Sequence, residues 1–188
     1  MGGAIYISIN KTLNSKLIEI HNCSFESCEN KIGGAVFIHS SIASQKFDIQ
    51  DCNFTSNKAN DNVNGNGAAI YFNSLQINLV NCKFNDNKAT KNGGAIYYEN
   101  VDVLTNNNDD INALFVSDCI FVSNSVDNQG GAIFISIKEE IQEGSIFINS
   151  CEFNKCESIK NGGGGIFFVI EKPVYDQINI QYNSFKNC

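Results

Sequence analysis

The chain of 188 residues carries a formal net charge of -7 and is 43% hydrophobic, which suffices for one domain with a substantial core. It has 20 acidic residues, and its 13 basic residues are all lysines. Because nucleic-acid binding needs a basic face and commonly an arginine that reads bases, nucleic acid is excluded as a partner. No apolar run approaches the roughly 20 residues that span a bilayer, and the first residues lack the pattern of a secretory signal.

A glycine-rich block recurs six times along the chain. Its copies begin at Gly2, Gly33, Gly67, Gly93, Gly130 and Gly163. Self-similarity at a period of about 20–50 residues indicates a repeat architecture. We therefore predict a single repeat segment over residues 1–188, with one coil beginning near each of these glycines. Because the chain opens and stops inside a repeat, we expect adjoining coils of a longer parent protein to be its first partners.

Each glycine-rich block predicts a turn that leads into a strand, since paired glycines permit positive φ and a close approach of backbones. An isoleucine or valine follows in every copy, and we place this position in the core. The next position is always aromatic, and alternation along a strand places it on the outer side. We therefore predict an exposed aromatic stripe that could serve as a contact surface. Its members are Tyr6, Phe37, Tyr71, Tyr97, Phe134 and Phe167.

A second phrase follows each block and predicts two more strands. Apolar residues alternate with polar ones, as in Ile18 and Ile20, which is typical of a strand with one buried face. An Asn or Asp such as Asn81 then predicts a tight bend. A short third strand is predicted next, with cysteine in its usual first slot and phenylalanine two places later. The polar stretch after this strand, such as residues 58–66, is predicted to be a loop. The sequence thus predicts an all-β parallel solenoid of about six coils, each made of three short strands.

The eight cysteines fall into two columns of this repeat. Cys23, Cys52, Cys82, Cys119 and Cys151 share an inward slot, and Cys28, Cys156 and Cys188 share a slot that is otherwise held by asparagine. Zinc needs ligands that converge tetrahedrally, and this spacing does not favour it, so we expect most thiols to fill the core unbridged. Cys156 and Cys188 form the best candidate disulfide pair. The remaining members of the second slot, Asn57, Asn87 and Asn124, predict a ladder of hydrogen-bonded side-chain amides.

Two short motifs recur in the chain. Gly-Gly-Ala-Ile is complete at Gly2, Gly93 and Gly130. Phe-x-x-Asn is present at Phe54, Phe84 and Phe121. With both motifs, the chain resembles the repeat of the chlamydial polymorphic outer membrane protein family over essentially its whole length. The resemblance implies a right-handed parallel β-helix, the pectin lyase-like fold, and a role in surface adhesion. It also implies a location at the cell surface or outside the cell.

No catalytic, cofactor-binding or metal-binding residue is predicted. A glycosidase needs paired carboxylates on a shared groove; Glu19 and Asp48 align, but Asn78 and Phe115 break their column. We favour a non-enzymatic surface module for adhesion or structural spacing, with a glycan or a protein surface as its partner. One alternative is a carbohydrate-binding or carbohydrate-degrading β-helix whose site lies outside this segment. Another is a scaffold component of a large assembly, which could be intracellular.

Overall fold

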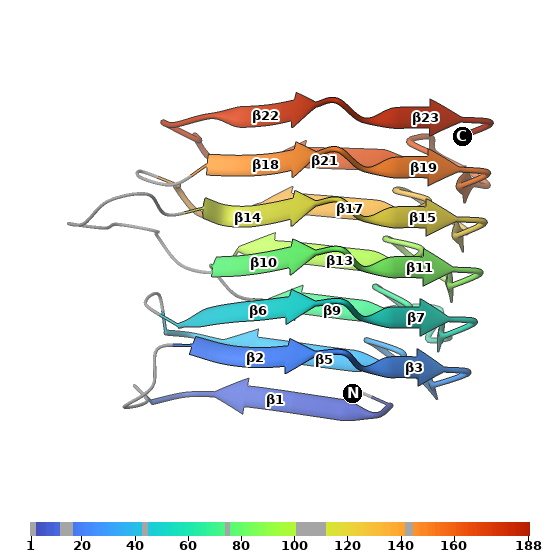
Figure 1. Ribbon diagram of the computed structural model, residues 1–188, viewed down its shortest axis with the longest axis horizontal. Helices are drawn as coiled ribbons and strands as arrows, with labels where there is room; N and C mark the ends of the chain where they lie inside the picture. Colours follow the sequence, from blue (N-terminus) through green and yellow to red (C-terminus); the bar gives the residue numbers. More distant parts are fainter. Residues whose placement is uncertain (1–2, 12–16, 43–44, 74–75, 101–111, 142–144) are drawn as a thin grey trace.

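The computed structural model describes residues 3–11, 17–42, 45–73, 76–100, 112–141 and 145–188. Within these ranges the chain contains strands and turns but no α-helix. Strands of successive repeats pair in parallel and stack into a β-solenoid of about five turns (Figure 1). The predicted all-β parallel solenoid is confirmed.

The three expected strands of each repeat form three sheets, each six strands deep. The first sheet contains β1 (Ile5–Ile9), β5 (Val36–Ser40), β9 (Ile70–Asn73), β13 (Ile96–Asn100), β17 (Ile133–Ile137) and β21 (Ile166–Ile170). The second contains β2 (Leu17–His21), β6 (Lys46–Gln50), β10 (Gln76–Val80), β14 (Asn112–Ser117), β18 (Ser145–Asn149) and β22 (Ile178–Gln181). The third contains β3 (Ser24–Glu26), β7 (Asn53–Thr55), β11 (Lys83–Asn85), β15 (Ile120–Val122), β19 (Glu152–Asn154) and β23 (Ser184–Lys186).

A fourth, five-stranded sheet was not predicted, because its residues were interpreted as loop. Its strands are β4 (Glu29–Asn30), β8 (Lys58–Ala59), β12 (Lys88–Ala89), β16 (Ser125–Val126) and β20 (Glu157–Ser158). Ala59, Ala89 and Val126 are fully buried and pack with Ala68 in a small cluster separate from the main core. A strand of two residues is too short to show a period of two, so alternation along the sequence does not reveal it.

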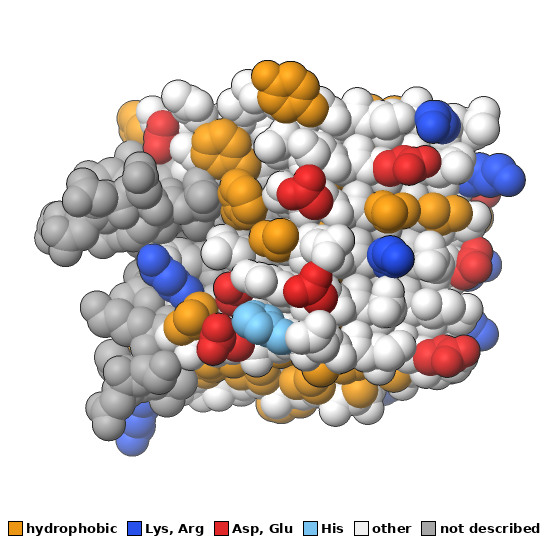
Figure 2. Space-filling view, in the orientation of Figure 1, with side chains coloured by type: hydrophobic (Ala, Val, Ile, Leu, Met, Phe, Trp, Pro, Cys, Tyr) orange, Lys and Arg blue, Asp and Glu red, His pale blue; other side chains and the backbone are white. Residues whose placement is uncertain are grey.

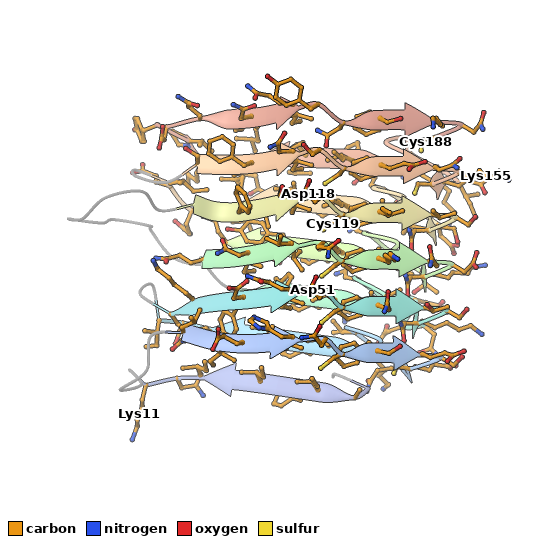
Figure 3. All side chains as sticks on the ribbon, viewed as in Figure 1. Lys11, Asp51, Asp118, Cys119, Lys155 and Cys188 are labelled. Carbon is orange, nitrogen blue, oxygen red and sulfur yellow. The ribbon has the colours of Figure 1, made fainter. Side chains whose placement is uncertain are left out.

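Tight bends separate the second sheet from the third, as the sequence predicted. At this position Asn22, Asp51, Asn81, Asp118, Ser150 and Tyr182 all have φ between 52° and 55°. Asp51 and Asp118 show how such a residue sits between two strands of its coil (Figure 3). A second bend of the same conformation follows the third strand, for example at Asp86 with φ 53°. The sequence did not reveal this second bend, because serine and lysine also occupy it.

The two glycines of each block have different physical tasks. Gly93 has a φ of +65°, which places it in the left-handed region that side chains disfavour. A Cβ at Gly94 would stand 1.9 Å from the carbonyl oxygen of Gly131 in the next coil. The first glycine therefore turns the chain, and the second lets neighbouring coils approach.

Every residue of the repeat stacks on its own counterpart, because the strands pair without offset over nearly all of their length. Ile96, for example, pairs with Ile70 on one side and Ile133 on the other. The inward positions join one continuous core. In the third sheet, the phenylalanine rings of adjacent coils stack face to face with centroids 4.7–4.9 Å apart, close to the spacing of about 4.8 Å between strands.

We predict that Phe84→Ala lowers the free energy of unfolding by about 3–5 kcal/mol, because it opens a cavity between Phe54 and Phe121 in a fully buried stack. Phe115→Ala serves as the control, since Phe115 is half-buried on the outer side of the second sheet. Its cost should stay near 1 kcal/mol. Urea denaturation of both variants measures the difference, and equal costs would contradict the stacked core.

An amide ladder runs parallel to the phenylalanine stack, as predicted. Asn87 accepts hydrogen bonds at Oδ1 from the backbone and side-chain nitrogens of Asn57, at 3.1 and 2.9 Å. Its Nδ2 donates to the carbonyl of Phe54 at 3.0 Å and to Asn124 Oδ1 at 2.9 Å. All three asparagines are fully buried. The ladder therefore satisfies backbone groups at a bend that strand pairing cannot reach.

Asn87→Ala should cost about 2–5 kcal/mol, because it leaves the buried Asn57 N–H and the Phe54 carbonyl without partners. The matched control is Asn53→Ala, which alters an exposed asparagine on β7. Thermal unfolding followed by circular dichroism compares the two. If Asn53→Ala destabilises the chain as much as Asn87→Ala, the ladder has no special role.

Candidate functional surfaces

The aromatic residues of the first sheet form one continuous stack outside the core. Neighbouring rings from Tyr6 to Phe167 lie 4.9–5.8 Å apart between centroids and within 11° of parallel. The preceding isoleucine or valine of each copy is in the core cluster or packed against it. The predicted directions of the two positions are therefore correct.

The exposure predicted for this stack is wrong for three of its members. Tyr6, at the end of the stack, is 51% exposed, whereas Phe37, Tyr97 and Phe134 are only 8%, 6% and 5% exposed. Rings in the interior of the stack have both faces covered by the rings of adjacent coils. Tyr71 and Phe167 are half-buried. A role of this stack as a contact surface stays a prediction.

Two tyrosines inside the stack, Tyr71 and Tyr97, have raised pKa values. Burial, reinforced by the charge of Glu99, raises the pKa of Tyr97 far above its ordinary value. Its hydroxyl donates to Glu99 Oε2 at 2.8 Å, and Lys138 pairs with the same carboxylate. Burial also raises the pKa of Tyr71 to about 12. These hydroxyls therefore stay protonated at neutral pH and act as hydrogen-bond donors.

The five-cysteine column lies where the sequence predicted it, at the start of the third strand. The Cys119 thiol donates to the carbonyl of Ser117 at 3.2 Å and accepts from the backbone nitrogen of Cys82 at 3.4 Å. Burial raises the pKa of Cys119 well above its ordinary value. Over the ranges that the structure describes, no cysteine belongs to a cluster of three metal-ligand atoms, since a linear column does not converge.

All eight cysteines are free thiols in this structure. Cys156 is buried and Cys188 is exposed, and burial raises the pKa of Cys156 to about 11. The two residues line an open pocket with Lys155 and Gly163 near the last strand, in the region where Figure 3 labels Lys155 and Cys188. Their pairing as a disulfide stays a prediction.

We predict that Cys188 reacts with iodoacetamide on the order of 100-fold faster than Cys52, Cys82 and Cys119, because the three buried thiols react only after local opening. Mass spectrometry after timed labelling at pH 8 gives the rate at each site. Labelling in denaturant serves as the control, and all eight thiols should then react. Fast native labelling of Cys119 would contradict the packed column.

The outer side of the second sheet carries a column that changes from coil to coil. In pairing order, its members are Glu19, Asp48, Asn78, Phe115, Phe147 and Asn179. Phe115 and Phe147 lie 6.3 Å apart between ring centroids at a tilt of 55°. Both are half-buried, as is Val80 on β10, the strand next to β14. Figure 2 shows hydrophobic side chains gathered over β14 and β18 on this face.

This pair of outward aromatic residues was not predicted from the sequence. From the sequence, Phe115 is only a residue that interrupts the column of aligned carboxylates formed by Glu19 and Asp48. The sequence nonetheless contains a usable pattern. An aromatic residue at the outward-facing strand position in two consecutive repeats predicts a local apolar patch.

The two histidines lie on different sheets. His39 Nδ1 is 2.9 Å from Asn73 Oδ1 on the first sheet. His21 Nε2 is 3.9 Å from Glu19 Oε1 on the second.

Comparison with known proteins gives one family. The model of the Chlamydia polymorphic membrane protein repeat matches residues 81–99 and 118–136. Each matched span begins at the bend before the third strand and ends in the next strand of the first sheet. No curated protein and no solved structure matches the chain. The described residues include no helix long and apolar enough to cross a membrane. The two matched spans and the parallel β-solenoid together show that the chain carries a polymorphic membrane protein-like β-helix repeat.

Proposed function

We propose that the chain is a non-enzymatic display module at the cell surface, which holds recognition groups on a rigid solenoid for adhesion. The observation that carries this proposal is the contrast between two columns of the second sheet. The inward column stays aliphatic or aromatic in every coil, whereas the outward column runs from carboxylates through an amide to phenylalanines. A constant frame with a variable outer face suits repeated display.

Rigidity supports this role. The stacked rings and the amide ladder fix each coil on its neighbour, so groups on the outer face are held in place before a partner arrives. Binding then costs less conformational entropy. The family match agrees with a surface role, because polymorphic membrane proteins are surface-associated.

The contact surface that we favour is the patch around Phe115 and Phe147. Their rings are tilted and half-buried, so part of each residue is open to a partner, whereas most rings inside the first-sheet stack are almost fully covered. Aromatic residues are enriched among residues that dominate binding energy, and a ring face also suits the apolar face of a sugar. In the first-sheet stack, which lies on a different sheet, Tyr6 is the most exposed ring.

Adhesion can be tested with beads that carry the purified chain and are washed over cultured cells, immobilised glycans and extracellular matrix proteins. We expect retention on at least one of these surfaces, and a loss of about tenfold or more in the double variant Phe115→Ser, Phe147→Ser. Tyr6→Ser is the comparison, because it removes the most exposed ring of the first-sheet stack.

Three outcomes would contradict the proposal. Retention on none of the surfaces would argue against adhesion. Undiminished retention of beads that carry the double variant would show that the contact lies elsewhere on the chain. Release of reducing sugars from a polysaccharide would favour the carbohydrate-degrading alternative. Thermal unfolding of each variant verifies that the solenoid is intact.

A further inference from the structure

A mixed cluster of metal-ligand side chains lies at the other end of the variable column. Glu19 and His21 stand two residues apart on β2 and therefore point to the same side of the sheet. Asp48 on β6 pairs directly with Glu19. Figure 2 shows a histidine among acidic side chains on the face over β2 and β6. We propose that Glu19, His21 and Asp48 form a binding site for a divalent transition-metal ion such as Zn²⁺.

The geometry suits such an ion. One ligand atom from each residue can be chosen so that all three lie within 4.8 Å of one another, and His21 Nε2 lies 3.9 Å from Glu19 Oε1. Zinc bonds of about 2.0–2.2 Å place tetrahedral ligands roughly 3.4 Å apart. Small side-chain rotations therefore close the site without movement of the strands. In the described part of the chain, this is the one group of three such ligands.

A cation would also stabilise the two neighbouring carboxylates, those of Glu19 and Asp48. Two carboxylates directly opposite each other on neighbouring strands repel, which destabilises the pair. Gln50 Nε2 donates to both oxygens of Asp48 at 2.9 Å, but this neutral amide supplies no positive charge. A dication between Asp48 and Glu19 would convert the repulsion into two attractive contacts.

The histidine decides which cation fits. Ca²⁺ and Mg²⁺ prefer sites made only of oxygen, whereas imidazole suits zinc, copper and nickel. The side chains of His21 and Glu19 are 35% and 57% exposed, so an ion can enter from solvent. Three protein ligands leave a coordination position open to water or to a partner's side chain.

The chain offers its own control, because it contains two histidines and, among the residues that the structure describes, only His21 belongs to a group with carboxylates. We would titrate the whole chain with Zn²⁺ and follow the ring Cε1–H signals of both histidines by NMR, assigned with His21→Asn. The His21 signal should move saturably at one equivalent, while the His39 signal stays in place. Because the exposed thiol of Cys188 can also take Zn²⁺, this residue-specific readout is preferable to the total heat.

Glu19→Gln and Asp48→Asn should each weaken Zn²⁺ binding at His21 by at least about tenfold, because each removes one ligand charge. Excess chelator should restore the original signal, and Ca²⁺ or Mg²⁺ at the same concentration should leave it unchanged. Equal responses of the two histidines would overturn the site, since they would indicate adventitious imidazole binding. An unaltered affinity in both carboxylate variants would overturn it as well.

Discussion

The structure depends on unshifted parallel pairing, because it places each side chain against its own copy one coil away. A residue type is then tolerated inside only if it packs well against itself at a spacing of about 4.8 Å. Phenylalanine meets this condition by stacking its rings, as Phe84 does on Phe54 and Phe121. Asparagine meets it because its amide both donates and accepts, and a small thiol meets it by size. The repeat thus follows from self-compatibility of side chains.

Unshifted pairing also stacks the side chains of the outer face, but these side chains contact solvent and need not pack densely. There the column on the second sheet changes its chemistry from Glu19 to Phe115 without any change of register. Function can therefore vary along the solenoid while the frame remains constant. The constant core therefore makes the repeat recognisable, whereas the variable outer face does not identify a partner.

Much of the frame could be predicted from the sequence because repetition reveals register. Asn81 and its counterparts predicted the bends, and Asn87 with its neighbours predicted the ladder, since each depends on one residue type in one slot. The fourth sheet could not be predicted, because Lys88 and Ala89 form too short a strand to show periodicity. Strand alternation correctly predicted that Tyr97 points outward, but it did not predict that Tyr97 is buried. On this face, burial comes from the rings of adjacent coils, and alternation along one strand does not reveal them.

Of the candidate surfaces, the sequence showed the alignment of Glu19 with Asp48 but not its meaning, because the approach of His21 depends on side-chain geometry. The structure places two members of this cluster, Glu19 and Asp48, in one outward column with the Phe115–Phe147 pair, from which Asn78 separates them. The pair begins two strands beyond Asp48, at a separation of about 10 Å. Because the solenoid fixes that separation, a single flat partner could contact both the proposed ion site and the rings. A rigid stack of coils would thereby join the two proposed sites into one composite face.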